Sequence, residues 1–552
     1  MGKPDAIRGE MIVDPRIKSV VSSFLDENLL LSPDLFEGIE NPLEKGFSFE
    51  GQGTRTPMVV LNRELFDILA NLPPDKINWR DFDRLRVLYE KRKEMVGYLN
   101  LVEILKKQKV TTGLASQHIK PTAGQADGTE YEIKYENLFR DVVAKLEVQD
   151  FIGHLNSRYK ALSEMLSARR DMQTVVSIGR LGGKKEREEV SVIGMVREKE
   201  VTMKNKHIKL TLEDPTGIIS VLVNKNNQEL YTQAKDLVED EVIGVKGTTG
   251  DKIIFSNSIS YPDIPLFKEV KKYNGPEEVY GIVLSDLHVG SINFLDKELE
   301  KGISWIRGEL GTESQREIAS KIKYIFMLGD LVDGVGVYPD QNKELTIKDI
   351  YDQYEACAGY LKDIPKDKKL IIIPGNHDAV RIEEPQPPLY DDIAASLFKL
   401  PNTLMLSNPC NVNLLSTKDF PGLDFLLYHG YSFTYYADNV ESIRQKGGVD
   451  RADLIMQFLL QKRHLAPTHT STIYNPDSKK DPLVIEKIPD FFMTGHLHKT
   501  NVSTYKNITT LSGSCWQSKT SFMEKIGIHP EPARIPVINF NTREVKIMRF
   551  GK

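Results

Sequence analysis

Short apolar segments recur in the second half of the chain, and polar side chains follow each of them directly. The segments have the length of buried strands, whereas a helix needs a longer run. Each predicted strand ends where a serine, glycine, proline or histidine begins the polar segment. The predicted strands and the polar segments after them are residues 279–284 and 285–288, 324–328 and 329–334, 370–373 and 374–378, 425–428 and 429–430, and 491–494 and 495–498.

These five units of strand and loop predict a layered α/β domain with one shared pocket. In such folds, ligands bind in the crevice outside the carboxyl ends of the strands. The polar side chains of all five loops can therefore meet, although they lie far apart along the chain. Helices are expected between the strands, for example over residues 349–361 and 440–464, and late strands over residues 507–511 and 537–540.

The side chains of this predicted pocket are those that bind a pair of divalent metal ions. Carboxylate oxygens and imidazole nitrogens suit Mn, Fe or Zn, whereas carboxylates alone would indicate Mg or Ca, and thiolates structural Zn. We therefore expect Mn²⁺ first, with Fe, Zn or Mg as alternatives. His496 and His498 are separated by one residue and can reach two neighbouring ions, and Asp330 is the candidate carboxylate that bridges both ions.

Upstream, over residues 171–263, the hydrophobic period changes to two. Five short strands with a helix after the third predict an OB-type β-barrel. Lys204, Lys206 and His207 lie in its second predicted hairpin, where such barrels can hold single-stranded nucleic acid. The segment lacks a series of aromatic residues that would stack bases, so a scaffold role for the barrel stays equally open.

The N-terminal part of the chain predicts helices. Asp14 before Pro15 is a helix-start signal, and residues 1–70 are expected to form a small helical module, either a docking unit or a stabilising cap. Residues 71–170 are expected to hold further helical segments, with a flexible linker at about residues 110–131. A helix predicted over residues 151–170 has an apolar face of Phe151, Leu155, Tyr159, Leu162 and Leu166.

Composition limits the class of protein. The chain has 552 residues, too many for one core, with 27% charged and 40% hydrophobic residues, which is typical of a globular protein of several domains. It has no apolar run long enough to span a bilayer and no signal peptide, so a cytoplasmic location is expected. Three widely spaced cysteines indicate free thiols, and a net charge of −5 gives no overall signature of nucleic-acid binding.

The polar motifs of residues 279–498 resemble those of the calcineurin-like metallophosphoesterases. Asp-x-His, Gly-Asp-x-x-Asp, Gly-Asn-His-Asp, His-Gly and Gly-His-x-His occur in that order. The resemblance implies that His377 contacts the reacting phosphate and that Asp378 sets the orientation of His377. The metal ligands that the resemblance implies are Asp286, His288, Asp330 and His498 for one ion, and Asp330, Asn376, His429 and His496 for the other.

The remaining candidate ligands fall outside this implied set. Asp333, which follows Asp330 by three residues, is a weaker ligand candidate than Asp330, because a carboxylate at this position can also serve only to orient the loop. The other histidines do not follow an apolar strand in such a motif and are predicted to be surface or core residues. They are His118, His154, His207, His464, His469 and His529.

The order of helical module, barrel and phosphoesterase domain, residues 275–552, resembles a narrower family, the small subunits of archaeal family D DNA polymerases. These are related to the B-subunits of eukaryotic replicative polymerases, in which the metal ligands are degenerate, whereas here every ligand position is filled. The segments that carry this resemblance are residues 192–196, 329–339, 349–354, 374–379, 463–467 and 513–517.

This narrower resemblance implies both a fold and a function. The fold is multidomain α+β, with a sandwich of sheets flanked by helices. The implied function is that of a metal-dependent 3′–5′ exonuclease that proofreads DNA for a separate large catalytic subunit by two-metal phosphodiester hydrolysis. The implied partners are that large subunit, DNA with a single-stranded 3′ end and a sliding clamp. A non-catalytic scaffold subunit and a free-standing phosphatase or cyclic-nucleotide phosphodiesterase are the alternatives.

Overall fold

The chain divides into two compact units, of which the first comprises residues 1–118 and 142–146. In this unit β1 (Leu29–Leu31) and β2 (Val59–Leu61) form a parallel pair of strands. The rest of the helical module predicted for residues 1–70 lies outside the described residues. The computed structural model describes residues 29–31, 59–61, 124–126, 133–137, 146–183, 187–525 and 527–551.

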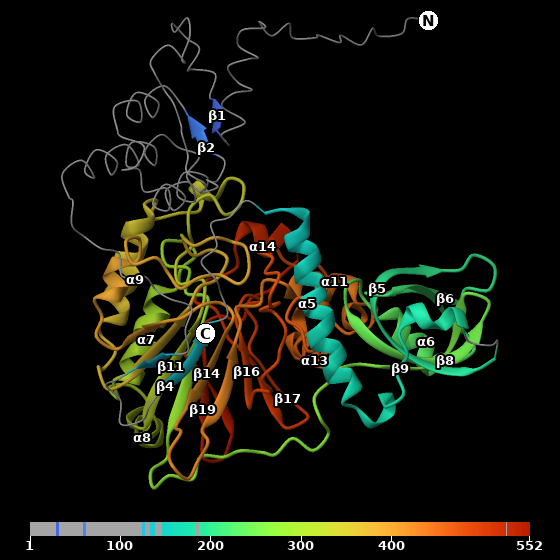
Figure 1. Cartoon of the computed structure of the whole chain (residues 1–552). Helices are drawn as coiled ribbons and strands as arrows, with labels where there is room; N and C mark the ends of the chain where they lie inside the picture. Colours follow the sequence, from blue (N-terminus) through green and yellow to red (C-terminus); the bar gives the residue numbers. More distant parts are fainter. Residues whose placement is uncertain are drawn as a thin grey trace, which may run out of the picture. The chain divides into compact units, whose positions relative to one another are not determined.

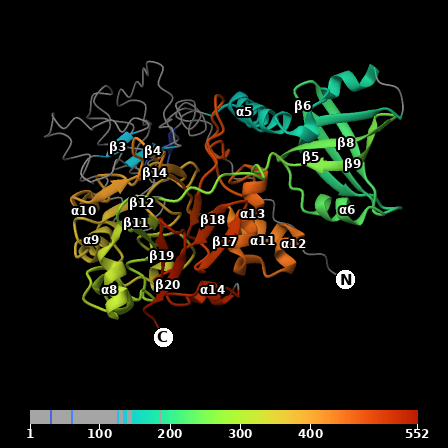
Figure 2. The same cartoon turned by 90° about the horizontal axis from the view of Figure 1, so that it is seen from below.

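The second unit contains a closed five-stranded barrel, which confirms the OB-type prediction. The barrel is the part that carries the labels β5, β6, β8, β9 and α6 in Figure 2. Its strand order is β5-β6-β7-β9-β8, and among these strands β7 and β9 are the only parallel neighbours. Alternate residues of β6 fill the barrel, because Ile208, Leu210 and Leu212 are buried whereas Lys209 and Thr211 are partly exposed. The barrel elements are β5 (Glu189–Val201), β6 (Ile208–Asp214), β7 (Gly217–Val223), α6 (Gln228–Lys235), β8 (Val242–Gly250) and β9 (Ile253–Ser260).

Two larger sheets form the phosphoesterase part of the same unit (Figure 1). The first has the strand order β13-β12-β11-β10-β19-β20, and the second has the order β17-β18-β16-β15-β14-β4-β3. The strands of the first sheet are β10 (Tyr280–Leu284), β11 (Ile322–Leu328), β12 (Lys369–Ile373), β13 (Thr403–Met405), β19 (Arg534–Asn539) and β20 (Val545–Arg549). Those of the second are β3 (Gly124–Ala126), β4 (Ile133–Asn137), β14 (Cys410–Leu414), β15 (Leu423–Leu427), β16 (Phe491–Thr494), β17 (Asn501–Tyr505) and β18 (Ile508–Ser512).

A hydrophobic core between the two sheets holds them face to face. Phe326 of β11 and Phe425 of β15 come from different sheets, and their ring centroids lie 5.1 Å apart. Phe425 also stacks on Phe491 of β16 at 4.8 Å, and all three rings are buried. Burial of aromatic rings is the main favourable contribution to a core of this kind, so the sandwich depends on these residues.

Helices cover the outer faces of the sandwich, as the sequence predicts. In Figures 1 and 2, α8 and α9 lie on one side of the strands, and α11 and α13 lie on the other. The helix predicted over residues 349–361 is α9, and its cap Asp349 accepts a hydrogen bond from the Tyr351 amide at 2.8 Å. The helices and 3₁₀ turns are α7 (Asp296–Ile306), α8 (Glu313–Ser320), η6 (Gln341–Lys343), α9 (Ile350–Leu361), α10 (Ala395–Phe398), α11 (Phe433–Asn439), α12 (Glu441–Gln445), η7 (Gly448–Asp450), α13 (Ala452–Lys462) and α14 (Ser521–Lys525).

The single helix predicted over residues 440–464 is wrong, because α12 and α13 are separate. Gly447 and Gly448 between them have φ of 126° and 55°, values outside a right-handed helix. Most of the flexible linker predicted at about residues 110–131 lies outside the described residues. Its residues 124–126 form β3, which pairs with β4, and β4 in turn pairs with β14 of the second sheet.

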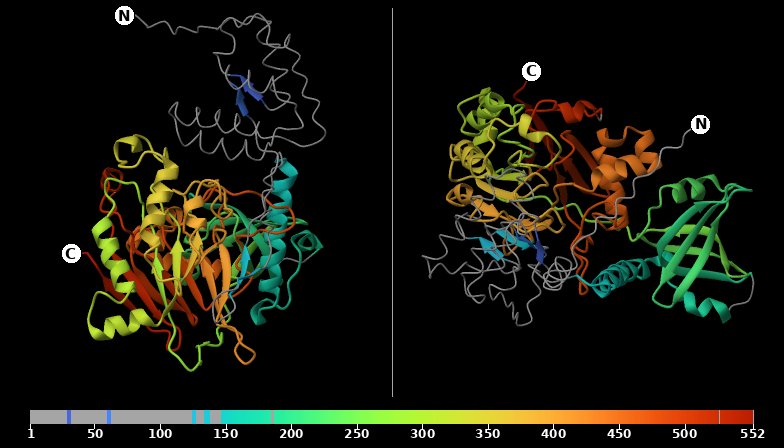
Figure 3. Two further views of the ribbon diagram at one scale, coloured as in Figure 1. Left: turned by 90° about the vertical axis from the view of Figure 1, so that its left-hand side faces the viewer. Right: turned by 90° about the horizontal axis from the view of Figure 1, so that it is seen from above.

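Helix α5 (Val148–Ser167) packs on the barrel strands β5 and β8 and runs beside the phosphoesterase part (Figure 3). The predicted apolar face is only partly right. Leu162 and Leu166 are buried, but Phe151 is 38% exposed, and His154 and Arg158 are buried instead. Hydrophobic periodicity misses this arrangement, since it cannot detect a distant partner for a buried charge. Two 3₁₀ turns follow the helix, η4 (Arg170–Met172) and η5 (Ile178–Gly183).

The distant partner is Asp481. Its Oδ2 accepts hydrogen bonds from Arg158 Nε at 2.6 Å and from His464 Nε2 at 2.8 Å, and His154 Nε2 lies 3.2 Å away. All four side chains are buried. His154 and His464 are therefore core residues that help to attach α5 to the phosphoesterase part.

Two further expectations can be compared with the structure. Cys357, Cys410 and Cys515 are free and buried, as their spacing predicts. Among the residues that the structure describes, no helix has the length and hydropathy of a membrane span.

Replacement of Asp481 by asparagine should lower the free energy of unfolding by about 3–5 kcal/mol, because the buried Arg158 loses its counterion. Urea denaturation followed by tryptophan fluorescence measures this change. The matched control is Glu544→Gln, which removes one carboxylate of an exposed ion pair with Lys546 and should leave stability unchanged. Equal stability of both variants would show that α5 is held by packing alone.

Candidate metal centre

Loops from both sheets meet at one site. Strands β10, β11 and β12 are parallel neighbours in the first sheet, and β15 and β16 are parallel neighbours in the second, so their carboxyl ends lie at the same edge of the sandwich. Backbone hydrogen bonds join the first two loops, from Asp286 to the Gly329 carbonyl and from His288 to the Asp330 carbonyl, both at 3.0 Å. All the predicted site residues come from these five loops.

The backbone of these loops has an unusual conformation. Five predicted ligands lie in the left-handed region, which costs a residue with a side chain on the order of 1 kcal/mol. Such strain persists only where the surrounding structure imposes it, and it is concentrated at functional sites. The five residues and their φ values are Asp286 (52°), His288 (53°), Asp330 (51°), His496 (69°) and His498 (56°).

Two glycines allow the loops to approach each other closely. A Cβ atom on Gly375 would lie 2.2 Å from Asp330 Oδ1, and one on Gly495 would lie 2.2 Å from Ser285 Oγ. Any side chain at either position would therefore displace the carboxylate or the hydroxyl group. The first residue of the Gly-Asn-His-Asp and Gly-His-x-His motifs is therefore glycine because the loops pack too closely for a side chain.

The first group of candidate ligands contains Asp286, His288 and His498, whose ligand atoms all lie within 4.8 Å of one another. His498 Nε2 is 3.4 Å from Asp286 Oδ1, and His288 Nε2 is 3.8 Å from Asp330 Oδ2. The two imidazole nitrogens of His288 and His498 face each other at 3.1 Å. Two such lone pairs repel unless a proton or a cation lies between them, so this arrangement fits a metal ion.

The second group contains Asp330, His429 and His496, again within 4.8 Å. His429 Nε2 lies 3.3 Å from Asp330 Oδ2 and 3.0 Å from Asn376 Oδ1. His429 Nδ1 donates a hydrogen bond to the Leu328 carbonyl at 2.7 Å, which directs Nε2 towards the group. Asp330 thus belongs to the second group and also lies next to His288 of the first.

The donor set as a whole suits two divalent cations. Asp286 and Asp330 are buried carboxylates in a cluster of imidazole nitrogens and an amide oxygen, and buried charges of one sign need compensation. The residues present therefore fit the metal ions that a metallophosphoesterase requires. These two groups contain six of the seven predicted ligands, and the seventh, Asn376, has its oxygen 3.0 Å from His429 Nε2. A third group, His288, Asp330 and His377, also has its ligand atoms within 4.8 Å of one another. The assignment of each ligand to a particular ion, and the expectation that His377 does not bind metal, stay predictions.

Asp333 orients one of these ligands. Its Oδ1 accepts a hydrogen bond from His288 Nδ1 at 3.1 Å, so His288 Nε2 points towards the first group. Gln341 Nε2 donates to Asp333 Oδ2 at 2.8 Å, and Gln517 Nε2 donates to Oδ1 at 2.9 Å. The two glutamines were missed by the sequence analysis, because a buried amide that lies 8 or 184 residues from its partner has no sequence signal.

His377 and Asp378 have different surroundings. His377 Nδ1 donates a hydrogen bond to the Asp333 carbonyl at 2.7 Å, and this contact orients the ring. Asp378 instead holds the loop, because its Oδ2 accepts from the Gly375 amide at 2.8 Å and its Oδ1 accepts from the Tyr354 hydroxyl at 3.1 Å. Asp378 acts on the backbone that carries His377, which is a less direct role than the family resemblance implies.

Burial and neighbouring charges shift the pKa values of the site residues. Burial opposes ionisation of Asp330, but the nearby His429 and His377 outweigh it and hold the pKa of that carboxyl well below its usual range. Burial likewise disfavours the charged form of His429, yet Asp330 raises its pKa from 6.5 to about 9. Burial lowers the pKa of His496 to about 3 and raises that of Asp378 to about 6.

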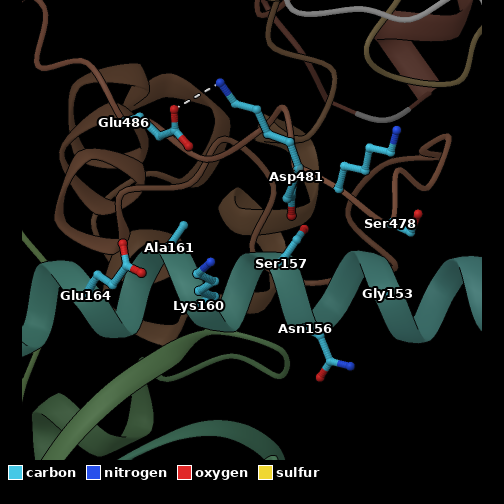
Figure 4. Close-up of a pocket in the computed structure, with 11 residues that line it drawn as sticks. Gly153, Asn156, Ser157, Lys160, Ala161, Glu164, Ser478, Asp481 and Glu486 are labelled. Carbon is cyan, nitrogen blue, oxygen red and sulfur yellow. Dashed lines mark ion pairs between the residues drawn. The ribbon is translucent and has the colours of Figure 1, made fainter.

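A separate cavity of about 560 Å³ lies between α5 and the loop of residues 478–486 (Figure 4). None of the predicted ligands lines it. Its walls carry charges of both signs, and Lys480 pairs with Glu486 across 2.9 Å. The cavity therefore offers no single charge for a substrate and is not a second candidate site.

Family models match both domains of the second unit. The calcineurin-like phosphoesterase model matches residues 282–500, and the model of an OB-fold nucleic acid binding domain matches residues 190–252. The first range includes every candidate ligand and both catalytic candidates. The second covers most of the barrel from β5 to the end of β8.

The chain is also similar to curated proteins named DNA polymerase II small subunit. One from Methanothermobacter thermautotrophicus is 39% identical over 406 residues, which cover 73% of this chain and 80% of that protein. One from Pyrococcus furiosus is 35% identical over 458 residues, covering 82% and 70%. One from Archaeoglobus fulgidus is 36% identical over 405 residues, covering 73% and 78%.

Solved structures add little. An asparaginyl-tRNA synthetase from Pyrococcus horikoshii complexed with asparaginyl-adenylate is 22% identical and covers 16% of this chain and 21% of that chain, with a TM-score of 0.14. A match of this extent carries no argument about fold or function.

Metal binding should release protons and strengthen as the pH rises. Because the pKa of His429 is raised to about 9, its protonated form stabilises the metal-free fold fully below pH 6.5, and this contribution is lost as the pH rises through about 9. A metal ion needs the neutral ring, so binding displaces the proton of His429. For each proton displaced, the apparent affinity for Mn²⁺ should rise about tenfold per pH unit between pH 7 and 8. Calorimetric titrations in buffers of different ionisation enthalpy count these protons. Affinity that does not change with pH would contradict the role of His429.

Replacement of Asp333 by asparagine should weaken Mn²⁺ binding about 10- to 100-fold, because His288 loses the carboxylate that orients it. Isothermal titration calorimetry gives the affinity. The control is Asp352→Asn at an exposed position of α9, which should bind Mn²⁺ like the wild type. Unchanged affinity of the Asp333 variant would mean that the two glutamines orient the loop without its carboxylate.

Proposed function

The chain belongs to the family of archaeal DNA polymerase II small subunits and contains a metallophosphoesterase domain, and on this premise we propose that it is a metal-dependent 3′–5′ exonuclease. In this role it proofreads DNA for the large catalytic subunit of the polymerase. One observation carries the proposal: every candidate ligand position holds a side chain that can bind a metal ion, and Asp330 lies beside both groups. A subunit with only a scaffold role would not need these buried, strained residues.

The first ion would be held by Asp286, His288, His498 and Asp330, and the second by Asp330, Asn376, His429 and His496. When bound, a pair of divalent cations supplies the positive charge that holds a phosphodiester and lowers the pKa of water. Mn²⁺ is the proposed pair, since imidazole and carboxylate ligands suit it better than Mg²⁺. The buried carboxylates keep both positions ready, because their low pKa values leave them ionised at neutral pH.

His377 would act on the phosphate directly. Its Nδ1 is engaged by the Asp333 carbonyl at 2.7 Å, which leaves Nε2 to face the substrate. Burial lowers the pKa of His377, and an anionic phosphate beside Nε2 favours the protonated ring. The imidazolium can then balance charge on the phosphate or give its proton to the leaving 3′ oxygen.

The proposed substrate and partners follow from the family. DNA with a single-stranded 3′ end would enter the site, and the large catalytic subunit would be a constant partner of this chain. A sliding clamp is a third proposed partner. We place the domain boundaries at residues 171–263 for the barrel and 275–552 for the phosphoesterase, with the helical module in residues 1–70.

The first test uses a 3′-mismatched primer-template labelled at the 5′ end, with Mn²⁺, and the protein alone and with its large subunit. The wild type should shorten the primer from its 3′ end. His377→Ala should bind metal ions normally and lose about a hundredfold or more in turnover, because proton transfer and charge balance are lost. Gel analysis of the products and calorimetry of Mn²⁺ binding measure both effects.

Two further variants complete this experiment. Asp330→Asn should lose more activity than the His377 variant, because both metal ions lose a ligand. His469→Ala, at an exposed histidine that contacts Asp240 of the barrel, should behave as the wild type. Full activity of His377→Ala would refute its assigned role. Absence of shortening with any divalent metal, with and without the large subunit, would favour the scaffold function.

A further inference from the structure

Two tyrosines flank the candidate metal centre. The ring of Tyr431 lies 5.8 Å from that of His496 at an angle of 60°. The ring of Tyr338 lies 6.3 Å from that of His377 at 58°. His496 belongs to the second ligand group and His377 lies beside the first, so one tyrosine stands at each end of the centre.

These tyrosines lie on the open side of the site. Asp286, Asp330 and His429 are buried, whereas His377 and His496 are partly exposed, so a substrate must approach past the latter two. Tyr338 and Tyr431 are themselves half-buried. Aromatic rings that served only the core would be covered, as the phenylalanines between the sheets are.

The backbone places Tyr431 beside the site, and hydrogen bonds hold Tyr338. Tyr431 directly follows Gly430, whose φ of 112° places the chain beside His496. The hydroxyl of Tyr338 donates a hydrogen bond to Glu344 Oε2 at 3.2 Å. The loop before Tyr338 is fixed as well, because the Val337 amide donates to Gln341 Oε1 at 2.8 Å, and Gln341 also holds Asp333.

We propose that Tyr338 and Tyr431 stack on the nucleobases on either side of the phosphodiester bond that is cut. This inference rests on the proposed nuclease function and identifies its substrate class as a single-stranded polynucleotide. Stacking on an aromatic ring requires unpaired bases and accepts all of them, because every base has a π face. A proofreading site needs this combination, since it must remove any nucleotide but only from a frayed end. Phosphomonoesters and small diesters lack the second base and would bind weakly.

The test compares Tyr338→Ala and Tyr431→Ala with the wild type on a 5′-labelled single-stranded oligodeoxynucleotide, with the full chain and Mn²⁺. Each alanine variant should raise KM about tenfold, and each phenylalanine variant, Tyr338→Phe or Tyr431→Phe, should keep the wild-type KM, because the ring remains. A second oligonucleotide with abasic sites at its two 3′-terminal positions removes the stacking partners. On the abasic oligonucleotide the wild type should have the same raised KM as the alanine variants have on the normal one. The alanine substitutions should not raise KM any further there.

A binding measurement separates this inference from the nuclease function. An oligonucleotide with 2-aminopurine at the 3′ end and a terminal phosphorothioate linkage resists cleavage, and its fluorescence should be quenched by the wild type and by the phenylalanine variants but not by the alanine variants. If the alanine variants do not quench the fluorescence and the wild type quenches it but does not shorten DNA, the result would support stacking and refute the exonuclease. The stacking proposal would be overturned if the alanine variants shortened DNA with the KM of the wild type. It would also be overturned if the alanine substitutions raised KM as much on the abasic oligonucleotide as on the normal one.

Discussion

The site depends on one buried, ionised carboxylate. Asp330 has a left-handed backbone, is almost completely buried, and accepts a hydrogen bond from the His377 amide at 2.8 Å. A charge in such a place must be balanced by nearby positive groups, and His429, whose pKa is raised to about 9, is a neighbouring histidine that supplies one. The same need makes the surrounding imidazoles available to cations. The meeting of five loops from two sheets thus brings imidazole groups to the buried negative charges of the site.

The positions of the strands could be predicted from sequence because buried strands are uniform apolar runs, and the polar residues at their ends interrupt them. For this reason the five strand ends and the residues that meet there were found without a structure. The conformation of those ends was not found. Left-handed φ values at Asp286 or His498 arise from contacts between loops, and such contacts leave no periodic pattern in the sequence.

The same limit explains what was missed elsewhere. The apolar face predicted for residues 151–170 did not include Arg158, because its partner Asp481 lies 323 residues further along the chain. Gln341 and Gln517 are ordinary polar residues until the fold places them on either side of the Asp333 carboxylate. Hydrophobic patterns predict which residues leave water, whereas buried polar networks depend on pairs that only the tertiary structure brings together.

The short strand β4 lies before the barrel in sequence but belongs to the sheet of the phosphoesterase. It pairs with β14, whose other neighbour is β15, so it covers one edge of the second sheet. A truncated chain that begins at the barrel would leave the backbone amide and carbonyl groups of β14 unpaired and exposed to other molecules. Any attempt to isolate the phosphoesterase part by removing its N-terminal flank therefore risks edge-to-edge aggregation, and residues 133–137 should be retained when the domain is produced alone.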